Sequence, residues 1–433
     1  MRNMFLPYLA LCLISAAELA APAFAAASVV PPSERSEEKI SHPVAQIASS
    51  VESGYVSASG TQFFLDGQPF YFQGSNFYRL GLIDRQADNE VYDIMRQYNE
   101  RGIRVVRIWG FSCGDQSKQA MLKSVNKDGA SYDEAALRRL DLAIDAARTY
   151  GIKVILPLVN YQAEYCPMSW WVKQVTGGSD FHQFYSDPFV RKAFKHHIGT
   201  LLHRENTIYQ AHRGEHRSYS DDPTIMAIEL TNELHTEDDY ELNRGGTPGD
   251  LVYHWLAEMS QHIRSLDRNH LISSGEEGYK ASPSTQEEAS KHSWLSNGRK
   301  GIDFSRNLSL ATIDFATIHP YPGNWGIPSS DIDWFLTNFI TDRANVAHGM
   351  GKPIVLEETG FSFHENPHLG YIAEPGKYMA MMYKAANKAG YAGTMAWEVV
   401  PPGSEIGDYV FDFNSPIALS IFQQIGFMAK RVP

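Results

Sequence analysis

Two segments of the chain lead from apolar residues into pairs of glutamates. The first is Ile228–Glu233 (Ile-Glu-Leu-Thr-Asn-Glu), and the second is Ile354–Glu358 (Ile-Val-Leu-Glu-Glu). Apolar runs that lead into carboxylates are typical of buried strands whose ends open into a functional site. Two carboxyl groups held about 5–5.5 Å apart can cleave a glycosidic bond with retention, one as nucleophile and one as proton donor and acceptor. The glutamates at the ends of these two segments are the candidates for such a pair.

The elements that must position this pair alternate along the chain from about residue 60. Short, near-continuous apolar runs, as expected for parallel strands buried on both faces, are followed by longer segments at helical spacing. Eight such strands over roughly 370 residues predict an α/β fold of the (β/α)₈ TIM barrel class. An open doubly wound sheet would need a Gly-rich phosphate turn after a strand, and the sequence has none. The eight expected strands are Phe70–Phe77, Arg104–Phe111, Lys153–Asn160, Thr224–Thr231, His270–Ser274, Asp314–His319, Pro353–Glu358 and Gly393–Trp397.

Helical segments are expected between most of these strands. Ser131-Tyr132-Asp133-Glu134 predicts a capping box that begins a helix, and Gly151 ends it. Thr247-Pro248-Gly249-Asp250 predicts a helix with Pro248 at its first position. The segment 280–313 has only a weak helical pattern. Further helices are expected near 88–101, 187–203, 331–348, 375–389 and 415–429.

In a barrel of this class the active residues lie at the C-terminal ends of the strands. Glu233 lies two residues after the fourth expected strand, and Glu358 ends the seventh. These strands lie on opposed sides of the barrel mouth, so the two carboxylates can face each other across a cleft.

The chain resembles glycoside hydrolase family five of clan A, and it is most similar to the endo-β-1,4-mannanase branch of that family. The resemblance covers roughly residues 60–400 and rests on the order and spacing of several short motifs. It implies retaining, endo-acting hydrolysis of β-1,4-mannosidic bonds in mannan or glucomannan, without a cofactor or a metal. The motifs are Phe72–Tyr78, Val106–Trp109, Leu158–Asn160, Asp221–Ile225, Glu229–Glu233, Gly275–Gly278, Asp314–Pro322 and Leu356–Gly360, with Trp397 closing the eighth strand.

The resemblance also implies roles for individual residues. Glu233 would be the general acid/base and Glu358 the nucleophile, so that Glu358 must be ionised while Glu233 carries a proton. Arg107 would hold Glu358 ionised, and Asn232 would bond the sugar 2-hydroxyl. The substrate-binding residues that it implies are Asn76, Arg107, Trp109, Asn160, Asn232, His319, Tyr321, Trp325 and Trp397.

The sequence departs from the mannanase pattern at several positions near the expected site. Tyr161-Gln162 stand where the pattern has Asn-Trp, and Leu234-His235 stand where it has Pro-Arg. Ile228 and Thr359 stand where the pattern has aromatic residues. Because the missing Arg is associated with the leaving-group side, an endo-β-1,4-glucanase or an exo-β-mannosidase on the same fold remains open. A non-catalytic carbohydrate-binding barrel is the alternative of another class, and the intact glutamate pair argues against it.

Composition limits the partners. The net charge of −12 gives no electrostatic footprint for nucleic acid or anionic lipid. Aromatic residues make up 12% of the chain, and their rings bury the apolar faces of sugar rings well, although they also fill protein cores. We expect a monomer that binds a neutral, β-linked plant-type polysaccharide or oligosaccharide. His196 and His197 adjoin on an expected helix and point apart, so they do not form a metal site.

The N-terminus has the pattern of an export signal. Arg2 precedes an apolar run from Met4 to Leu13, and Ala23-Phe24-Ala25 forms an A-x-A cleavage site. The following segment is rich in Ser, Ala, Pro and Glu. We expect a secreted or periplasmic protein that has no membrane attachment after cleavage. The expected division is a signal peptide at 1–25, a flexible arm at 26–55 and a catalytic (β/α)₈ barrel at 56–433.

Two cysteines remain after the expected cleavage, Cys113 and Cys166. They follow the second and third expected strands, which are neighbours in a barrel. In an oxidising compartment they form either a disulfide that braces the rim of the cleft or two free buried thiols.

Overall fold

The computed structural model describes residues 54–81, 87–114, 120–237, 239–362, 374–402, 404 and 409–429, the last six of these by their backbone only. The signal peptide expected at 1–25 lies outside the described residues. Of the arm expected at 26–55, only Gly54 and Tyr55 are described. The main chain of Gly54 accepts a bond of 2.8 Å from Nζ of Lys153, so this point of the chain is held against the barrel.

Eight parallel strands form one sheet, and each overlaps a strand predicted from the sequence. Their order across the sheet is β10-β9-β8-β5-β4-β13-β12-β11. The strands are β4 (Phe72–Asn76), β5 (Ile103–Arg107), β8 (Lys153–Pro157), β9 (Ile225–Glu229), β10 (Leu271–Ser273), β11 (Ala316–Ile318), β12 (Ile354–Leu356) and β13 (Gly393–Ala396).

The two edge strands, β10 and β11, meet and nearly close the sheet into a barrel. The backbone N–H of Asp314 donates to the carbonyl of Ile272 at 2.8 Å, and the N–H of His319 donates to the carbonyl of Glu277 at 3.3 Å. The side chain of Asp314 accepts a further bond of 2.7 Å from the N–H of Ile272. The (β/α)₈ TIM barrel predicted from the sequence is therefore confirmed.

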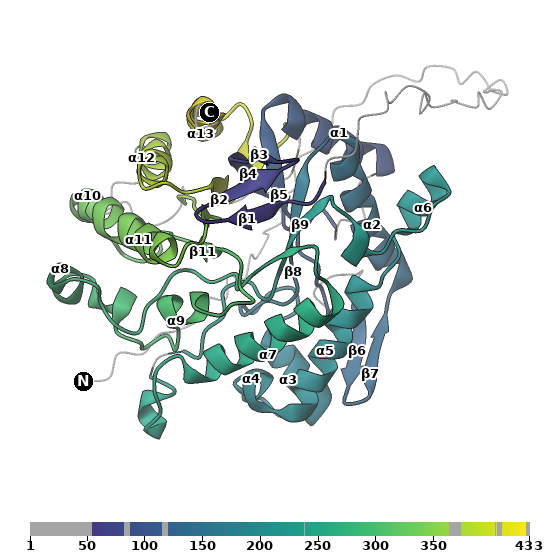
Figure 1. The fold of residues 1–433 in the computed structure, drawn as a ribbon, viewed down its shortest axis with the longest axis horizontal. Helices are drawn as coiled ribbons and strands as arrows, with labels where there is room; N and C mark the ends of the chain where they lie inside the picture. Colours follow the sequence, from purple (N-terminus) through teal and green to yellow (C-terminus); the bar gives the residue numbers. More distant parts are fainter. Residues whose placement is uncertain are drawn as a thin grey trace, which may run out of the picture. The chain divides into compact units, whose positions relative to one another are not determined.

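Helices surround the strands (Figure 1). Among the described residues, no helix combines the length and the apolar character that crossing a bilayer requires. A π-helical turn at Leu336–Ile340 joins α10 to α11. The helices are α1 (Asp88–Glu100), α2 (Glu134–Thr149), α3 (Met168–Thr176), α4 (Gln183–Ser186), α5 (Pro188–Leu202), α6 (Thr207–Arg213), α7 (Asp250–Leu266), α8 (Gln286–Ser290), α9 (Phe304–Leu308), α10 (Ile332–Phe335), α11 (Thr341–Gly349), α12 (Pro375–Lys388) and α13 (Pro416–Ala429).

The segment 280–313 contains the short helices α8 and α9 and a 3-10 turn at Ser293–Ser296, which explains its weak helical pattern. Ion pairs take the place of a long packed helix there. Nζ of Lys280 lies 3.0 Å from Glu288 and 2.7 Å from Asp342, and Arg343 lies 2.7 Å from Glu288. These buried contacts anchor the segment to α11.

Two helix starts differ from the prediction. Helix α2 begins after Asp133, whose carboxylate accepts hydrogen bonds from the N–H groups of Ala135 and Ala136. Ser131 does not begin the helix, because it belongs to a hairpin of β6 (Leu122–Asn126) and β7 (Gly129–Tyr132). The capping box was therefore wrong. Helix α7 begins at Asp250 rather than at Pro248, because Gly249 turns there with a φ of 86°.

The N-terminal end of the barrel is filled by apolar side chains. A small antiparallel sheet, β1 (Ser57–Ser59), β2 (Gln62–Leu65) and β3 (Gln68–Pro69), brings Phe63 into the same buried cluster as the barrel interior. The ring of Phe63 lies 5.4 Å from Phe315. The opposite end, where the strands finish, is the end that holds a cleft.

Candidate active site

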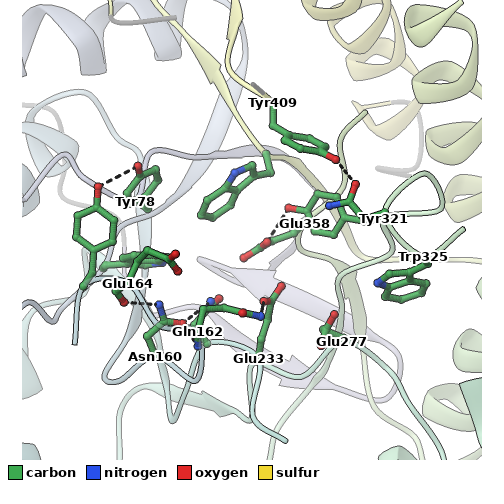
Figure 2. Close-up of a pocket in the computed structure, with 15 residues that line it drawn as sticks. Tyr78, Asn160, Gln162, Glu164, Glu233, Glu277, Tyr321, Trp325, Glu358 and Tyr409 are labelled. Atoms are coloured by element: carbon green, nitrogen blue, oxygen red, sulfur yellow. Dashed lines mark hydrogen bonds between the residues drawn. The ribbon is translucent and has the colours of Figure 1, made fainter. Parts of the chain in front are cut away.

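A cleft of about 450 Å³ lies at the C-terminal ends of the strands, and both candidate glutamates line it. Figure 2 shows Glu233 and Glu358 on facing sides of this cleft. One carboxylate oxygen of Glu233 and one of Glu358 lie within 4.8 Å of each other. This spacing fits a retaining pair, because an inverting pair needs about 6.5–9.5 Å to admit a water molecule.

A sharp backbone turn brings Glu233 into the cleft. Glu233 has a φ of 57°, which is uncommon for a residue other than glycine, and its N–H donates to the carbonyl of Gly275 at 2.8 Å. Gly275 is required at this close approach, since a Cβ there would lie 1.9 Å from the carbonyl oxygen of Thr231. The end of β9 and the segment after β10 therefore fix the position of Glu233 together.

Arg107 connects the base of the site. Its Nη1 donates to Oε1 of Glu358 at 2.5 Å, its Nη2 donates to Oδ1 of Asn232 at 2.8 Å, and it forms a buried ion pair with Glu229. Burial alone would lower the pKa of Arg107, but the carboxylates of Glu229, Glu357 and Glu358 hold that pKa well above its usual value. Arg107 is thus a permanent cation whose charge is shared among three carboxylates.

His319 lies between two glutamates. Its Nδ1 is 3.0 Å from Oε1 of Glu233, and its Nε2 is 3.0 Å from Oε2 of Glu357. Burial acts to lower the pKa of His319, but Glu358, Glu233 and Glu357 raise it well above its usual value. A protonated His319 donates from both ring nitrogens, which satisfies both neighbouring carboxylates.

The contacts of the free protein set the order in which the two glutamates ionise. Burial raises the pKa of Glu358 to about 7, although His319, Arg107 and a bond of 2.8 Å from the Tyr321 hydroxyl favour its ionised form. Burial also acts to raise the pKa of Glu233, but hydrogen bonds from His319 and Gln162 hold it below its usual value. Glu233 is therefore the more readily ionised of the two, the opposite of the order that the first chemical step needs.

Three of the residues expected to bind substrate lie behind the cleft surface. Asn76, Arg107 and His319 are fully buried and do not line the cleft. The side-chain amide of Asn76 donates to the carbonyls of Glu357 at 2.9 Å and Ala396 at 3.2 Å, so it joins the ends of β12 and β13. They support the residues in front of them, as the resemblance implies for Arg107 and Glu358, and their binding of substrate stays a prediction.

The other expected residues do line the cleft. Trp397 stacks on Tyr78 with ring centroids 5.1 Å apart, and Trp109 lies 4.6 Å from Tyr78. This aromatic wall lies along one side, and Trp325 lies at another part of the cleft beside Tyr279, at 5.4 Å. The expected residues that line the cleft are Trp109, Asn160, Asn232, Tyr321, Trp325 and Trp397.

Several lining residues were not predicted. Most lie in loops, where no periodic pattern marks which side chains turn inward. The one available signal was the departure from the family pattern at Tyr161-Gln162, which marked the position but not its contact with Glu233. The unpredicted lining residues are Gln162, Glu164, Tyr165, Asn324 and Tyr409, whereas Tyr78 and Glu277 lie in two of the motifs that carry the resemblance.

The structure joins Cys113 to Cys166 in a disulfide with a Cα–Cα distance of 4.8 Å. The bond ties the segment after β5 to the loop after β8. Tyr165, the residue before Cys166, has a φ of 62° and lies 5.3 Å from the ring of Trp109. The disulfide therefore lies directly behind the aromatic wall of the cleft.

Glu233, His319 and Glu358 are, within the described ranges, a group whose ligand atoms lie close enough to hold a metal ion. Arg107 already places a positive charge 2.5 Å from Glu358. A cation at this point would be repelled by that guanidinium, so the arrangement suits proton transfer better than metal binding.

The chain was compared with known proteins by sequence. A family profile described as GH family 5 beta-mannosidase-like matches residues 53–389. Mannan endo-1,4-beta-mannosidase 1 of Oryza sativa subsp. japonica is 32% identical over 369 residues, which covers 81% of this chain and 80% of the relative. Mannan endo-1,4-beta-mannosidase F of Aspergillus fumigatus is 31% identical over 315 residues, which covers 71% of this chain and 64% of the relative.

Solved structures agree with this grouping. The endo-1,4-beta-mannanase from Rhizomucor miehei superposes with a TM-score of 0.73 at 27% identity, covering 87% of this chain and 100% of the other. A glycoside hydrolase family 5 mannosidase from the same fungus has a TM-score of 0.68 at 21% identity, which speaks for the fold alone.

Proposed function

Because this chain belongs to glycoside hydrolase family 5, among its β-mannosidase-like members, we propose that it hydrolyses internal β-1,4-mannosidic bonds of mannan or glucomannan with retention of configuration. The observation that carries the proposal is the approach of Glu233 and Glu358 to within 4.8 Å above the Arg107 guanidinium. A pair at that distance has room for a sugar C1 but not for an additional attacking water.

In the first step Glu358 attacks C1 of the sugar as a carboxylate. A C1–O bond forms to Glu358 while the glycosidic C1–O bond breaks, and the proton of Glu233 passes to the departing glycosidic oxygen. The leaving-group sugar departs as a neutral alcohol. The Glu358 carboxyl that Arg107 and Tyr321 contact is then an ester rather than an anion.

In the second step a water molecule takes the place of the leaving group. Glu233, now ionised, accepts a proton from the water. At the same time the oxygen of the water bonds to C1, and the ester bond between C1 and Glu358 breaks. The electron pair returns to the Glu358 carboxylate, which the hydrogen bonds from Arg107 and Tyr321 stabilise. Two inversions at C1 restore the original configuration.

The aromatic wall supports a polymeric sugar substrate. Trp397, Tyr78, Trp109 and Tyr165 line the same cleft as Glu358, and aromatic ring faces pack against the C–H faces of sugar rings. Mannose differs from glucose in an axial 2-hydroxyl. Asn232, held at Oδ1 by Arg107, is the residue we assign to that hydroxyl, which gives the site a polar reason to reject glucose.

We propose that the protein acts after export, as a monomer. The Ala23-Phe24-Ala25 pattern supports cleavage after the N-terminal 25 residues, and the Cys113–Cys166 disulfide suits an oxidising compartment.

Product analysis tests the proposed activity. The purified enzyme is incubated with mannan, glucomannan, cellulose and xylan. We expect a rapid fall in the viscosity of mannan and a ladder of oligosaccharides. Release of mannose alone from chain ends would identify an exo-β-mannosidase, equal cleavage of cellulose would identify an endoglucanase, and binding without products would identify a non-catalytic barrel.

A further inference from the structure

The side chain of Gln162 contacts Glu233 directly. Its Nε2 donates to Oε2 of Glu233 at 2.8 Å. Gln162 lies in the loop after β8, is exposed and lines the cleft, where Figure 2 shows it beside Glu233. The mannanase pattern has Trp at this position, and a Trp side chain is larger and has no carbonyl acceptor. A Trp could donate from its indole N–H, so what this chain supplies at the position is a smaller and more flexible donor.

The two oxygens of Glu233 are held in different ways. Oε1 lies 3.0 Å from Nδ1 of His319, which is fully buried and is held at its other nitrogen by Glu357. Oε2 accepts from Gln162, whose side chain reaches it from the exposed side. A leaving-group oxygen can reach only an oxygen whose present partner is able to withdraw. Oε2 is consequently the oxygen that transfers the proton.

We propose that Gln162 is a positioning residue that switches Glu233 between base and acid. In the free enzyme its amide donates to Oε2 and stabilises the ionised carboxylate. When substrate binds, the leaving-group oxygen displaces this amide, so Glu233 loses a contact that stabilised its ionised form. The proton that the pair holds then passes from Glu358 to Glu233, which can donate it. After the leaving group departs, the incoming water donates its proton to Oε2. The amide returns to Oε2 once the product has left and the proton has passed back to Glu358. This inference rests on the proposed function, since it concerns the acid/base of that reaction.

Other groups also face Glu233, but substrate cannot move them in the same way. The carboxylates of Glu358 and Glu277 oppose its ionisation, while His319 and His235 favour it. All four of these side chains are buried. The hydroxyls of Tyr321 and Tyr279 also interact with its charge, each with a pKa raised well above the usual value, first by burial. Gln162 is the exposed contact of Glu233, and its hydrogen bond helps to hold the pKa of Glu233 below its usual value.

The first measurement reads Glu233 without substrate. Glutamate side-chain carboxyls are labelled with carbon-13, the Glu233 resonance is assigned by its loss in Glu233→Gln, and the protein is titrated. Gln162→Met keeps the length of the side chain but cannot donate a hydrogen bond to Glu233. We therefore expect the titration midpoint of the Glu233 carboxyl to rise by about one pH unit. Gln162→Ala should also raise the titration midpoint of Glu233. Tyr161→Phe is the matched control, because it removes a bond of 3.0 Å to Glu237 from the same loop and leaves the Gln162 contact intact.

The second measurement tests displacement by substrate. The pH dependence of kcat/KM reports the free enzyme, and that of kcat reports the complex. With a mannooligosaccharide that fills the leaving-group side, Gln162→Met should raise the acid limb of kcat/KM by about one pH unit and leave the limbs of kcat in place.

Two results would contradict the proposed role of Gln162. An unchanged Glu233 midpoint in Gln162→Met overturns it, and so does an equal shift in the limbs of kcat/KM and kcat. If the wild-type enzyme hydrolyses no mannan, the proposed function fails, whereas the titration of Glu233 still shows whether Gln162 stabilises its ionised form.

Discussion

One carboxylate oxygen of Glu233 lies within 4.8 Å of one carboxylate oxygen of Glu358 at the mouth of the barrel. Two buried anions at this distance repel each other strongly, so the pair retains one proton over a range of pH. Arg107 and His319 supply the positive charge that lets the second carboxyl ionise. The pair therefore carries both forms that a double displacement needs, and the predictions below follow from its surroundings.

Removal of either carboxyl should stop turnover while the fold survives. Glu233→Ala should lower kcat on mannan by about 10²–10⁴-fold, because it removes the general acid, and should lose less on an aryl mannoside whose leaving group needs no proton. Glu358→Ala should be rescued by azide with formation of an inverted glycosyl azide, detected by NMR. If Glu357→Ala lost all activity and Glu358→Ala retained it, the nucleophile would be Glu357.

The pH profile of kcat/KM should be bell-shaped, with limbs set by the free site. As pH rises through about 7, the pair loses its last proton from Glu358, and the acid function is lost. As pH falls below the lowered pKa of Glu233, both carboxyls are protonated and no nucleophile remains. Tyr321→Phe removes a donor from Glu358, so its pKa rises and the alkaline limb should move upward. A downward move, measured on the same substrate, would contradict this order of ionisation.

His235→Arg should improve the turnover of short mannooligosaccharides relative to polymer. Nε2 of His235 lies 2.5 Å from Oε2 of Glu277, which lines the cleft, and an Arg can make this contact as an ion pair while adding donors on the leaving-group side. We expect a gain of several-fold in kcat/KM on mannotriose, measured against the wild type. Because His235 is buried between Tyr161 and Tyr279, equal losses on all substrates would mean that an Arg does not fit there.

Thiol titration of the denatured, unreduced mature protein should find no free thiol from Cys113 or Cys166. The bond closes a loop with a sequence separation of 53 residues, so its loss should lower the free energy of unfolding by about 4 kcal/mol. The double variant Cys113→Ser/Cys166→Ser should unfold at a lower denaturant concentration. Two titratable thiols in the untreated protein would exclude the disulfide.

His197 should make the protein sensitive to acid. Burial lowers the pKa of His197 to about 3, so the unfolded chain binds its proton from about pH 6.5 downward while the folded chain does not. Stability from this residue is complete above pH 6.5 and falls by about 2 kcal/mol between pH 6.5 and 5. His197→Phe should flatten the dependence of the unfolding midpoint over this range. His196→Phe, on the exposed side of the same helix, is the control and should not flatten it.

The sequence by itself determined the barrel and the positions of its two chemical glutamates. Parallel strands buried on both faces require near-continuous apolar runs, and these runs are visible along the chain without any knowledge of tertiary contacts. Carboxylates that follow such runs lie at the mouth of the barrel, which pointed to the glutamates after the fourth and seventh strands. The resemblance to family five selected Glu233 and Glu358 among them. The same reasoning identified Trp109, Asn160 and Trp397 as lining residues.

Only the tertiary structure decided which loop residues turn their side chains into the cleft. It also decided which of the two glutamates holds the shared proton. Gln162 and Tyr165 turn inward because an irregular loop and a disulfide hold them, and neither is marked by a periodic pattern. Asn76 and His319 lie behind the surface because strands distant in sequence enclose them. The order of ionisation of the two glutamates is set by burial and by contacts from several strands. The sequence of either segment therefore cannot predict it, because these contacts form only when the barrel has folded.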